Sequence, residues 1–133
     1  GEGFFNGDAI GGAGLFRSVD GGLSWDVMPG TAELGNICRI AISPADSDII
    51  VLATRYGGLR RTTDGGGSWT TVYGAQGAFD VHFSPANPSR AIAQIIDHDG
   101  DWFHRALYST DAGATWLTAS GLEHVDGFGA RIE

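Results

Sequence analysis

An eight-residue pattern occurs three times in this chain and constrains its fold more than any other feature. Each copy begins with a hydroxyl residue and has Asp at its third position and Gly at its fifth. It ends with Ser or Thr at the seventh position and Trp at the eighth. The copies occupy residues 18–25, 62–69 and 109–116, so their tryptophans are 44 and 47 residues apart. A pattern repeated at such an interval indicates an array of similar structural units.

Both flanks of each copy are predicted to be β-strands. A strand–turn–strand order puts the pattern in a hairpin loop. A second repeated element is Ser-Pro at Pro44 and Pro85, which ends a preceding strand because proline cannot donate to a ladder. No stretch has the period of 3.6 residues that a helix requires. The predicted strands cover residues 14–17, 26–28, 48–54, 58–61, 70–73, 90–96 and 105–108.

One repeat unit therefore contains four strands, here lettered A to D, in about 44 residues. This is the size of one propeller blade. We predict an all-β fold of four-stranded antiparallel blades, about three of them, forming part of a β-propeller. An immunoglobulin-like sandwich fits less well, because sandwiches do not repeat a turn in register. The single domain, residues 1–133, divides into blade parts at about 4–29, 37–73 and 78–119, with 124–133 starting or completing another blade.

Composition narrows the possible partners. Sixteen acidic against eight basic residues give a net charge of −8, which disfavours nucleic acid and anionic membranes. No run approaches the eighteen apolar residues of a membrane span. The single cysteine, Cys38, lies among isoleucines and is expected to be a small core residue. The chain begins at Gly1 without an initiator methionine, as a mature form or an excised segment would.

The repeated Asp and Trp residues are expected to be structural. Asp side chains in such loops accept hydrogen bonds from backbone N–H groups of their own turn. The indole ring can cover the hairpin while its N–H finds a carbonyl. Because they recur once per blade at one equivalent place, they lie far apart and cannot form one site. These residues are Asp20, Trp25, Asp64, Trp69, Asp111 and Trp116.

The three motifs resemble the Asp box, or BNR repeat, of sialidases, xyloglucan-active glycoside hydrolases, sortilin-type receptor domains and a photosystem assembly factor. The resemblance covers nearly the whole chain. It implies that the boxes lie on C–D hairpins, at the rim opposite the functional face, and act as scaffold. It also implies an extracellular or periplasmic location.

By this resemblance, the B–C and D–A connections carry any functional site. These connections are residues 8–12, 55–58, 97–104, 31–36, 74–80 and 123–127. The candidate ligand-binding residues are Arg55, Tyr56, Asp101, Trp102 and His104. Glycoside hydrolysis needs two carboxyl groups facing one bond, for which the candidates are Asp8, Asp80, Asp97 and Asp99.

The segment 97–104 also resembles the start of a calcium loop. Asp97, Asp99 and Asp101 stand at alternate positions, but the glycine comes one place early and Tyr108 replaces the bidentate Glu. A solvated acidic loop or a sugar-stacking Trp102 are the alternatives. No metal or other cofactor is expected.

The motifs of two enzyme families match only in part. Xyloglucanase-like enzymes have a catalytic Asp after Thr and shortly before Gly-Gly, where this chain has Arg55 after Thr54, and Asp8 is a looser match. Sialidases need three arginines, a Tyr nucleophile and an Arg-Ile-Pro stretch, and that stretch is missing. His82, between Val81 and Phe83, is expected to be a strand residue rather than a base.

The sequence therefore predicts a binding or scaffold module for a carbohydrate or protein ligand. The alternative is a segment of a glycoside hydrolase, xyloglucanase-like or sialidase-like. About three blades are too few for a closed propeller, which has four to eight. We expect self-association, or the remainder of a longer chain, to close the ring.

Overall fold

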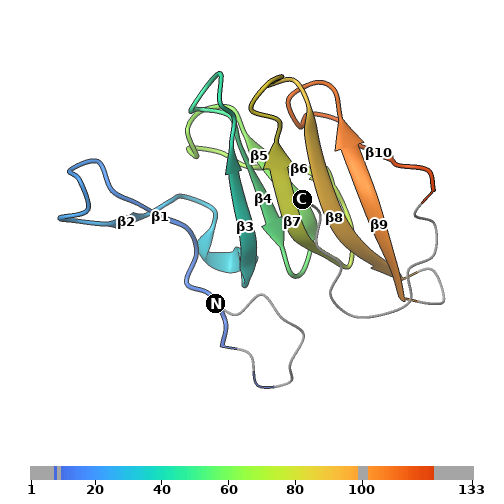
Figure 1. Ribbon diagram of the computed structural model, residues 1–133. Helices are drawn as coiled ribbons and strands as arrows, with labels where there is room; N and C mark the ends of the chain where they lie inside the picture. Colours follow the sequence, from blue (N-terminus) through green and yellow to red (C-terminus); the bar gives the residue numbers. More distant parts are fainter. Residues whose placement is uncertain (1–7, 9, 99–101, 122–133) are drawn as a thin grey trace.

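The computed structural model describes residue 8 and residues 10–98 and 102–121. Two four-stranded antiparallel sheets pack together, and a two-stranded hairpin lies to one side of them (Figure 1). The helical content of the described residues is one 3-10 turn, η1 (Ala32–Leu34). The predicted all-β blade architecture is confirmed.

Each sheet is a meander whose strands keep their chain order. The hairpin contains β1 (Phe16–Arg17) and β2 (Asp26–Val27). The first blade contains β3 (Ile37–Ile42), β4 (Ile50–Thr54), β5 (Gly58–Thr62) and β6 (Thr70–Tyr73). The second blade contains β7 (Gly77–Phe83), β8 (Ala91–His98), β9 (Trp102–Ser109) and β10 (Leu117–Thr118).

Two predicted boundaries were wrong. The connection expected at 97–104 is only residues 99–101, because β8 and β9 continue toward each other and pair Asp97 with Phe103. Aromatic residues such as Trp102 and Phe103 favour strands, and this preference outweighs the low strand propensity of the neighbouring Asp residues. Asp80, expected in a loop at 74–80, lies inside β7 and pairs with Gln94.

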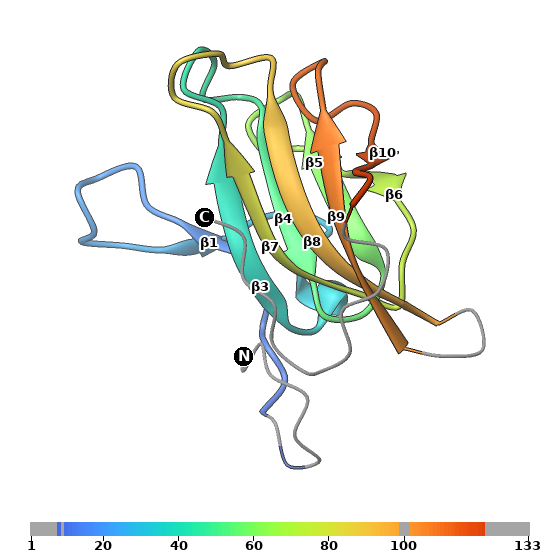
Figure 2. The ribbon, with the colours of Figure 1, turned by 45° about the vertical axis from the view of Figure 1, so that its right-hand side comes forward.

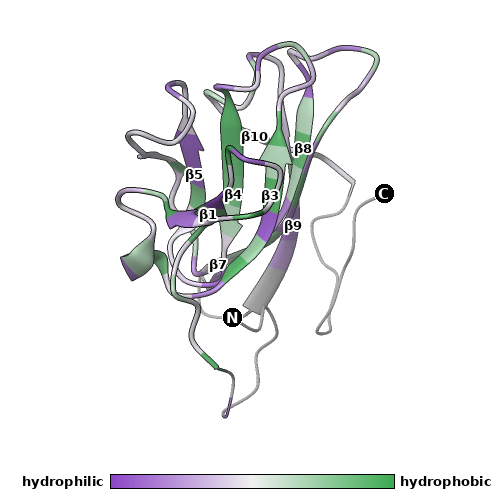
Figure 3. Cartoon of the chain, turned by 90° about the vertical axis from the view of Figure 1, so that its left-hand side faces the viewer, coloured by the Kyte–Doolittle hydropathy of each residue, from purple (hydrophilic) through white to green (hydrophobic). Residues whose placement is uncertain are grey.

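The hydrophobic core lies between the two blades. Val51 and Leu59 of the first blade and Val81 and Leu107 of the second are at most 1% exposed and belong to one cluster. All five residues of β4 are buried, and Figure 3 shows this strand as hydrophobic along most of its length. Burying one leucine side chain stabilises the fold by about 1.5–3 kcal/mol. The apolar side chains buried between the two sheets therefore hold the blades together.

The Asp-box turns connect β1 to β2, β5 to β6 and β9 to β10. In the second box, Thr62 Oγ1 donates to Asp64 Oδ1 at 2.6 Å, and Oδ1 also accepts from the Ser68 N–H at 2.9 Å. The Ser68 hydroxyl donates to Asp64 Oδ2 at 2.7 Å. The first and third boxes have the same bonds. Each carboxylate therefore holds its own turn together.

These hydrogen bonds favour the ionised form of each carboxyl group. The Thr115 hydroxyl, followed by the Thr115 N–H, lowers the pKa of Asp111 to about 2. The Thr62 and Ser68 hydroxyls hold the pKa of Asp64 well below its usual range, and Ser24 does the same to the pKa of Asp20. A carboxyl group so stabilised as an anion is a poor proton donor.

Candidate functional site

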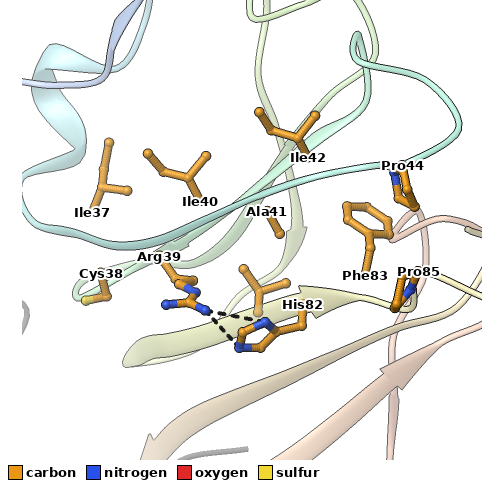
Figure 4. A pocket seen from close by; sticks show the side chains of 11 residues that line it. Ile37, Cys38, Arg39, Ile40, Ala41, Ile42, Pro44, His82, Phe83 and Pro85 are labelled. Atoms are coloured by element: carbon orange, nitrogen blue, oxygen red, sulfur yellow. Dashed lines mark hydrogen bonds between the residues drawn. The ribbon is translucent and has the colours of Figure 1, made fainter. Parts of the chain in front are cut away.

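Strands β3 and β7 are the first strands of their blades and lie next to each other (Figure 2). Their free edges border an open hollow of about 540 Å³ (Figure 4). Most of the lining residues have apolar side chains or, at Cys38, a thiol, and Arg39 and His82 supply the strongly polar groups. The apolar lining residues are Ile37, Cys38, Ile40, Ala41, Ile42, Pro44, Val81, Phe83 and Pro85.

A polar cluster joins the two strands beside this hollow. Arg39 Nε of β3 lies 3.3 Å from Asp80 Oδ1 of β7, and His82 Nε2 lies 3.0 Å from the same oxygen. Arg39 Nη2 is also 3.3 Å from His82 Nε2. Asp80 Oδ1 further accepts the N–H of Val81 at 3.1 Å. Figure 4 shows Arg39 and His82 pointing toward each other across the gap between the strands.

This cluster surrounds the carboxyl group of Asp80. Its side chain is 10% exposed, and nitrogen atoms of Arg39, His82 and Val81 lie within 3.3 Å of its Oδ1. Glycoside hydrolysis needs two carboxyl groups that face one scissile bond. The described residues that line the hollow include no Asp or Glu.

Arg55 and Tyr56 form the turn between β4 and β5. Arg55 is 5% exposed, and its backbone N–H donates to the Asn36 carbonyl at 2.8 Å. Its guanidinium Cζ lies 5.1 Å from the centre of the Tyr56 ring. Tyr56 is 57% exposed. β7 begins close to this turn, because a Cβ at Gly77 would lie 2.7 Å from the Arg55 carbonyl oxygen. Arg55, which stands at the position of the xyloglucanase Asp, is thus packed into the fold.

Cys38 lies on β3 next to this turn. Burial raises the pKa of its thiol to about 11, and the positive charge of Arg55 only partly opposes that effect. The thiol therefore remains protonated at neutral pH, whereas a nucleophilic cysteine needs its thiolate.

His104 is 5% exposed and faces Gln94, which is 2% exposed. Gln94 Nε2 lies 2.7 Å from His104 Nδ1 and donates to the Ile95 carbonyl at 3.1 Å. His104 therefore makes a buried contact, although it was proposed for ligand binding. Gln94 was missed, although a glutamine inside the apolar run 91–96 is itself a signal of a buried polar contact.

The other candidates do not gather at the hollow. Asp8 is exposed in a turn, Asp97 is partly buried near the end of β8, and Trp102 begins β9. Asp99 and Asp101 lie outside the described residues, so the resemblance of segment 97–104 to a calcium loop is not tested. Of the three candidate carboxylates among the described residues, Asp80 is the one beside the hollow, in contact with the lining residues Arg39 and His82.

Repeated four-stranded blades with an Asp box on the C–D turn define the class: part of a β-propeller of the Asp-box type. No helix in the described part of the chain is long and apolar enough to cross a membrane. Residues 13–128 match the family model Sortilin-Vps10, described as sortilin, neurotensin receptor 3. The chain belongs to this family.

Two kinds of relative extend the comparison. Xyloglucanase Xgh74A of Acetivibrio thermocellus is 31% identical over 141 residues, an alignment that covers 80% of this chain and 16% of the enzyme. The crystal structure of an ancestral GH74 enzyme matches with a TM-score of 0.67 at 22% identity, covering 80% of this chain and 15% of that one. The chain thus spans about one sixth of the length of these relatives and shares their fold.

Proposed function

We propose that this chain is a non-catalytic binding module, and that the hollow between β3 and β7 receives a segment of a polypeptide ligand. The observation that carries the proposal is the set of residues that line the hollow. No Asp or Glu is among the described residues that line the hollow, and Asp80 beside it contacts Arg39 and His82. The site therefore offers contacts for binding but no pair of carboxyl groups.

The chemistry of the hollow favours a peptide over a sugar. Ile40 and Ile42 are 46% and 55% exposed, and the side chain of Arg39 is 48% exposed beside them. Exposed aliphatic side chains contribute most binding free energy when apolar groups of a ligand cover them. A guanidinium recognises a carboxylate. The family description names a receptor, which agrees with a binding role.

The second candidate is a segment of a glycoside hydrolase. It is favoured by the 31% identity to a xyloglucanase over most of this chain. In that case the catalytic pair would need at least one carboxyl group from outside the described lining of the hollow. A xyloglucan chain would then bind at the same face and be cleaved.

A peptide array, a glycan array and an assay of xyloglucan hydrolysis separate these functions. We expect the labelled chain to bind peptides that combine aliphatic and acidic residues, and to release no reducing ends from xyloglucan. Ile40→Asp should abolish peptide binding, because it places a charge in the hollow. Ile10→Asp, at a 71% exposed position that does not line the hollow, should leave binding intact. Binding to glycans alone, or release of reducing ends, would overturn the proposal.

A further inference from the structure

Three polar side chains meet at one carboxylate oxygen beside the hollow. Arg39 Nε lies 3.3 Å and His82 Nε2 lies 3.0 Å from Asp80 Oδ1. Arg39 extends from β3 and the other two side chains extend from β7, so the cluster joins two consecutive four-stranded blades. Arg39 and His82 also line the hollow. A change within the cluster is therefore a change in the wall of the site.

Arg39 and His82 contact each other as well as the carboxylate. Arg39 Nη2 lies 3.3 Å from His82 Nε2 and 3.5 Å from His82 Nδ1, and Figure 4 draws both contacts as dashed lines. A neutral imidazole has one nitrogen that donates a hydrogen bond and one that accepts. With its proton on Nε2, neutral His82 donates to Asp80, and its Nδ1 accepts from Arg39. The neutral ring therefore suits both neighbours.

A second proton on His82 removes that acceptor. Both nitrogens of an imidazolium are donors, so Arg39 Nη2 then faces a like charge at 3.3–3.5 Å. Two cations must also share one carboxylate oxygen. His82 is held near Asp80 because the two residues are two positions apart on β7, whereas the Arg39 side chain is 48% exposed on another strand. Arg39 is therefore the cation that leaves the carboxylate.

The strands packed against β7 place no other described charge on His82. Among the described residues, Arg39 and Asp80 are the charged groups that contact its ring. On β8, Ile92 pairs with His82 and Gln94 pairs with Asp80, and neither side chain is charged. β4 has no titratable side chain. The other described titratable side chains of β3, β5 and β8 are Cys38, Arg60, Arg61 and Asp97.

Protonation of His82 changes the charge of the hollow. The cluster has no net charge while His82 is neutral, and it has a net charge of +1 when the ring is protonated. No Asp or Glu is among the described lining residues to oppose that charge. The whole chain has a net charge of −8, which disfavours acidic ligands elsewhere on its surface. A guanidinium that has left Asp80 can bind a ligand carboxylate instead.

We propose that His82 regulates the ligand affinity of the hollow, because its protonation releases Arg39 from Asp80 and strengthens the binding of an acidic polypeptide segment. The inference rests on the proposed function, since it concerns the same hollow and the same class of ligand. A histidine side chain gains its proton between about pH 8 and pH 5. The hollow therefore binds an acidic segment more tightly in mildly acidic solution than at neutral pH.

Fluorescence anisotropy with a short, end-blocked peptide of alternating leucine and glutamate tests this regulation. We expect the unmodified chain to bind the peptide about fivefold more tightly at about pH 5.5 than at about pH 7.5, the effect of one added charge near a ligand carboxylate. His82→Gln keeps a donor for Asp80 and should bind with one affinity at both pH values. His82→Lys is charged at both pH values and should bind tightly at both. A peptide of alternating leucine and glutamine should show no pH dependence.

NMR of the unmodified chain without ligand tests the link between the two side chains. The Arg39 Nε signal should shift with the same midpoint as the His82 ring, and it should stay constant over this pH range in His82→Gln. Thermal unfolding at both pH values verifies that each variant is folded. An Arg39 signal that ignores the titration of His82, or equal peptide affinity at both pH values, would overturn this inference alone. Absence of peptide binding at both pH values would overturn the proposed function together with it.

Discussion

Arg39 Nε lies 3.3 Å from Asp80 Oδ1, so the first strands of two consecutive blades are joined by an ion pair. The two partners differ in environment, since the Arg39 side chain is 48% exposed and the Asp80 side chain is 10% exposed. His82 shares the same carboxylate oxygen. This pair fixes β3 against β7 and thereby shapes the edge of the hollow.

Replacing Asp80 by Asn should destabilise the chain. The substitution keeps the shape of the side chain but leaves Arg39 and His82 adjacent without an anion between them. We expect a loss of about 1–3 kcal/mol in the free energy of unfolding, measured by urea denaturation. Asp26→Asn removes a charge from an exposed position on β2 and should change stability by less than about 0.5 kcal/mol. Equal effects of the two substitutions would contradict this account of the cluster.

The bond from Arg61 to the Ala112 carbonyl should contribute to the packing of the two blades. Arg61→Ala removes a donor at 2.9 Å and should reduce the free energy of unfolding by about 1–2 kcal/mol. Arg90→Ala serves as the matched control, since Arg90 is exposed and its hydrogen bonds to other described residues are made by its backbone groups. Chemical denaturation of both variants measures the difference. If Arg90→Ala were as destabilising as Arg61→Ala, the inter-blade bond would have no special role.

Acid should loosen the Asp-box turns. The pKa of Asp111 is about 2 in the folded chain and about 3.9 when unfolded, so its contribution is complete above the unfolded value and is lost as the pH falls through the folded value. We expect the melting temperature to fall between about pH 4 and pH 2. Asp111→Asn should make that fall shallower, whereas Asp26→Asn should not. A melting temperature that is constant over this range would contradict the assignment.

Cys38 should react slowly while the chain is folded. Burial raises the pKa of its thiol to about 11, whereas an unfolded thiol has a pKa of about 8.5. The folded chain should therefore contain more than a hundredfold less thiolate at about pH 8, and alkylation by iodoacetamide should slow at least as much. Alkylation in concentrated urea gives the unfolded rate. Similar rates in the two conditions would show that the thiol is accessible and ionised.

The blade architecture could be predicted because local chemistry repeats along the sequence. Asp64 and its two equivalents mark the third turn of each unit, while Pro44 and Pro85 mark the first. Each of these turns depends on hydrogen bonds or backbone restraints within a few residues, so the spacing of residues in the sequence is enough to predict the turn. The observed strand order follows directly from these marks.

The cluster at the hollow could not be predicted in this way. Arg39 and Asp80 are separated by a whole blade, and nothing in their own neighbourhoods indicates a contact. Irregular register near Cys38 and near Phe79 also changes which side chains share a face. The buried pair of Gln94 and His104 likewise depends on the register of β8 and β9. Contacts of this kind depend on how the blades pack against each other. A local sequence pattern does not indicate which distant residues that packing brings together.

Release of reducing ends from xyloglucan, compared between the unmodified chain and Asp80→Asn, tests the central claim most directly. The account predicts no release by either protein, while the unmodified chain binds its peptide ligand on the array. Release by the unmodified chain that disappears in Asp80→Asn would show that Asp80 is catalytic, and it would contradict a non-catalytic binding module.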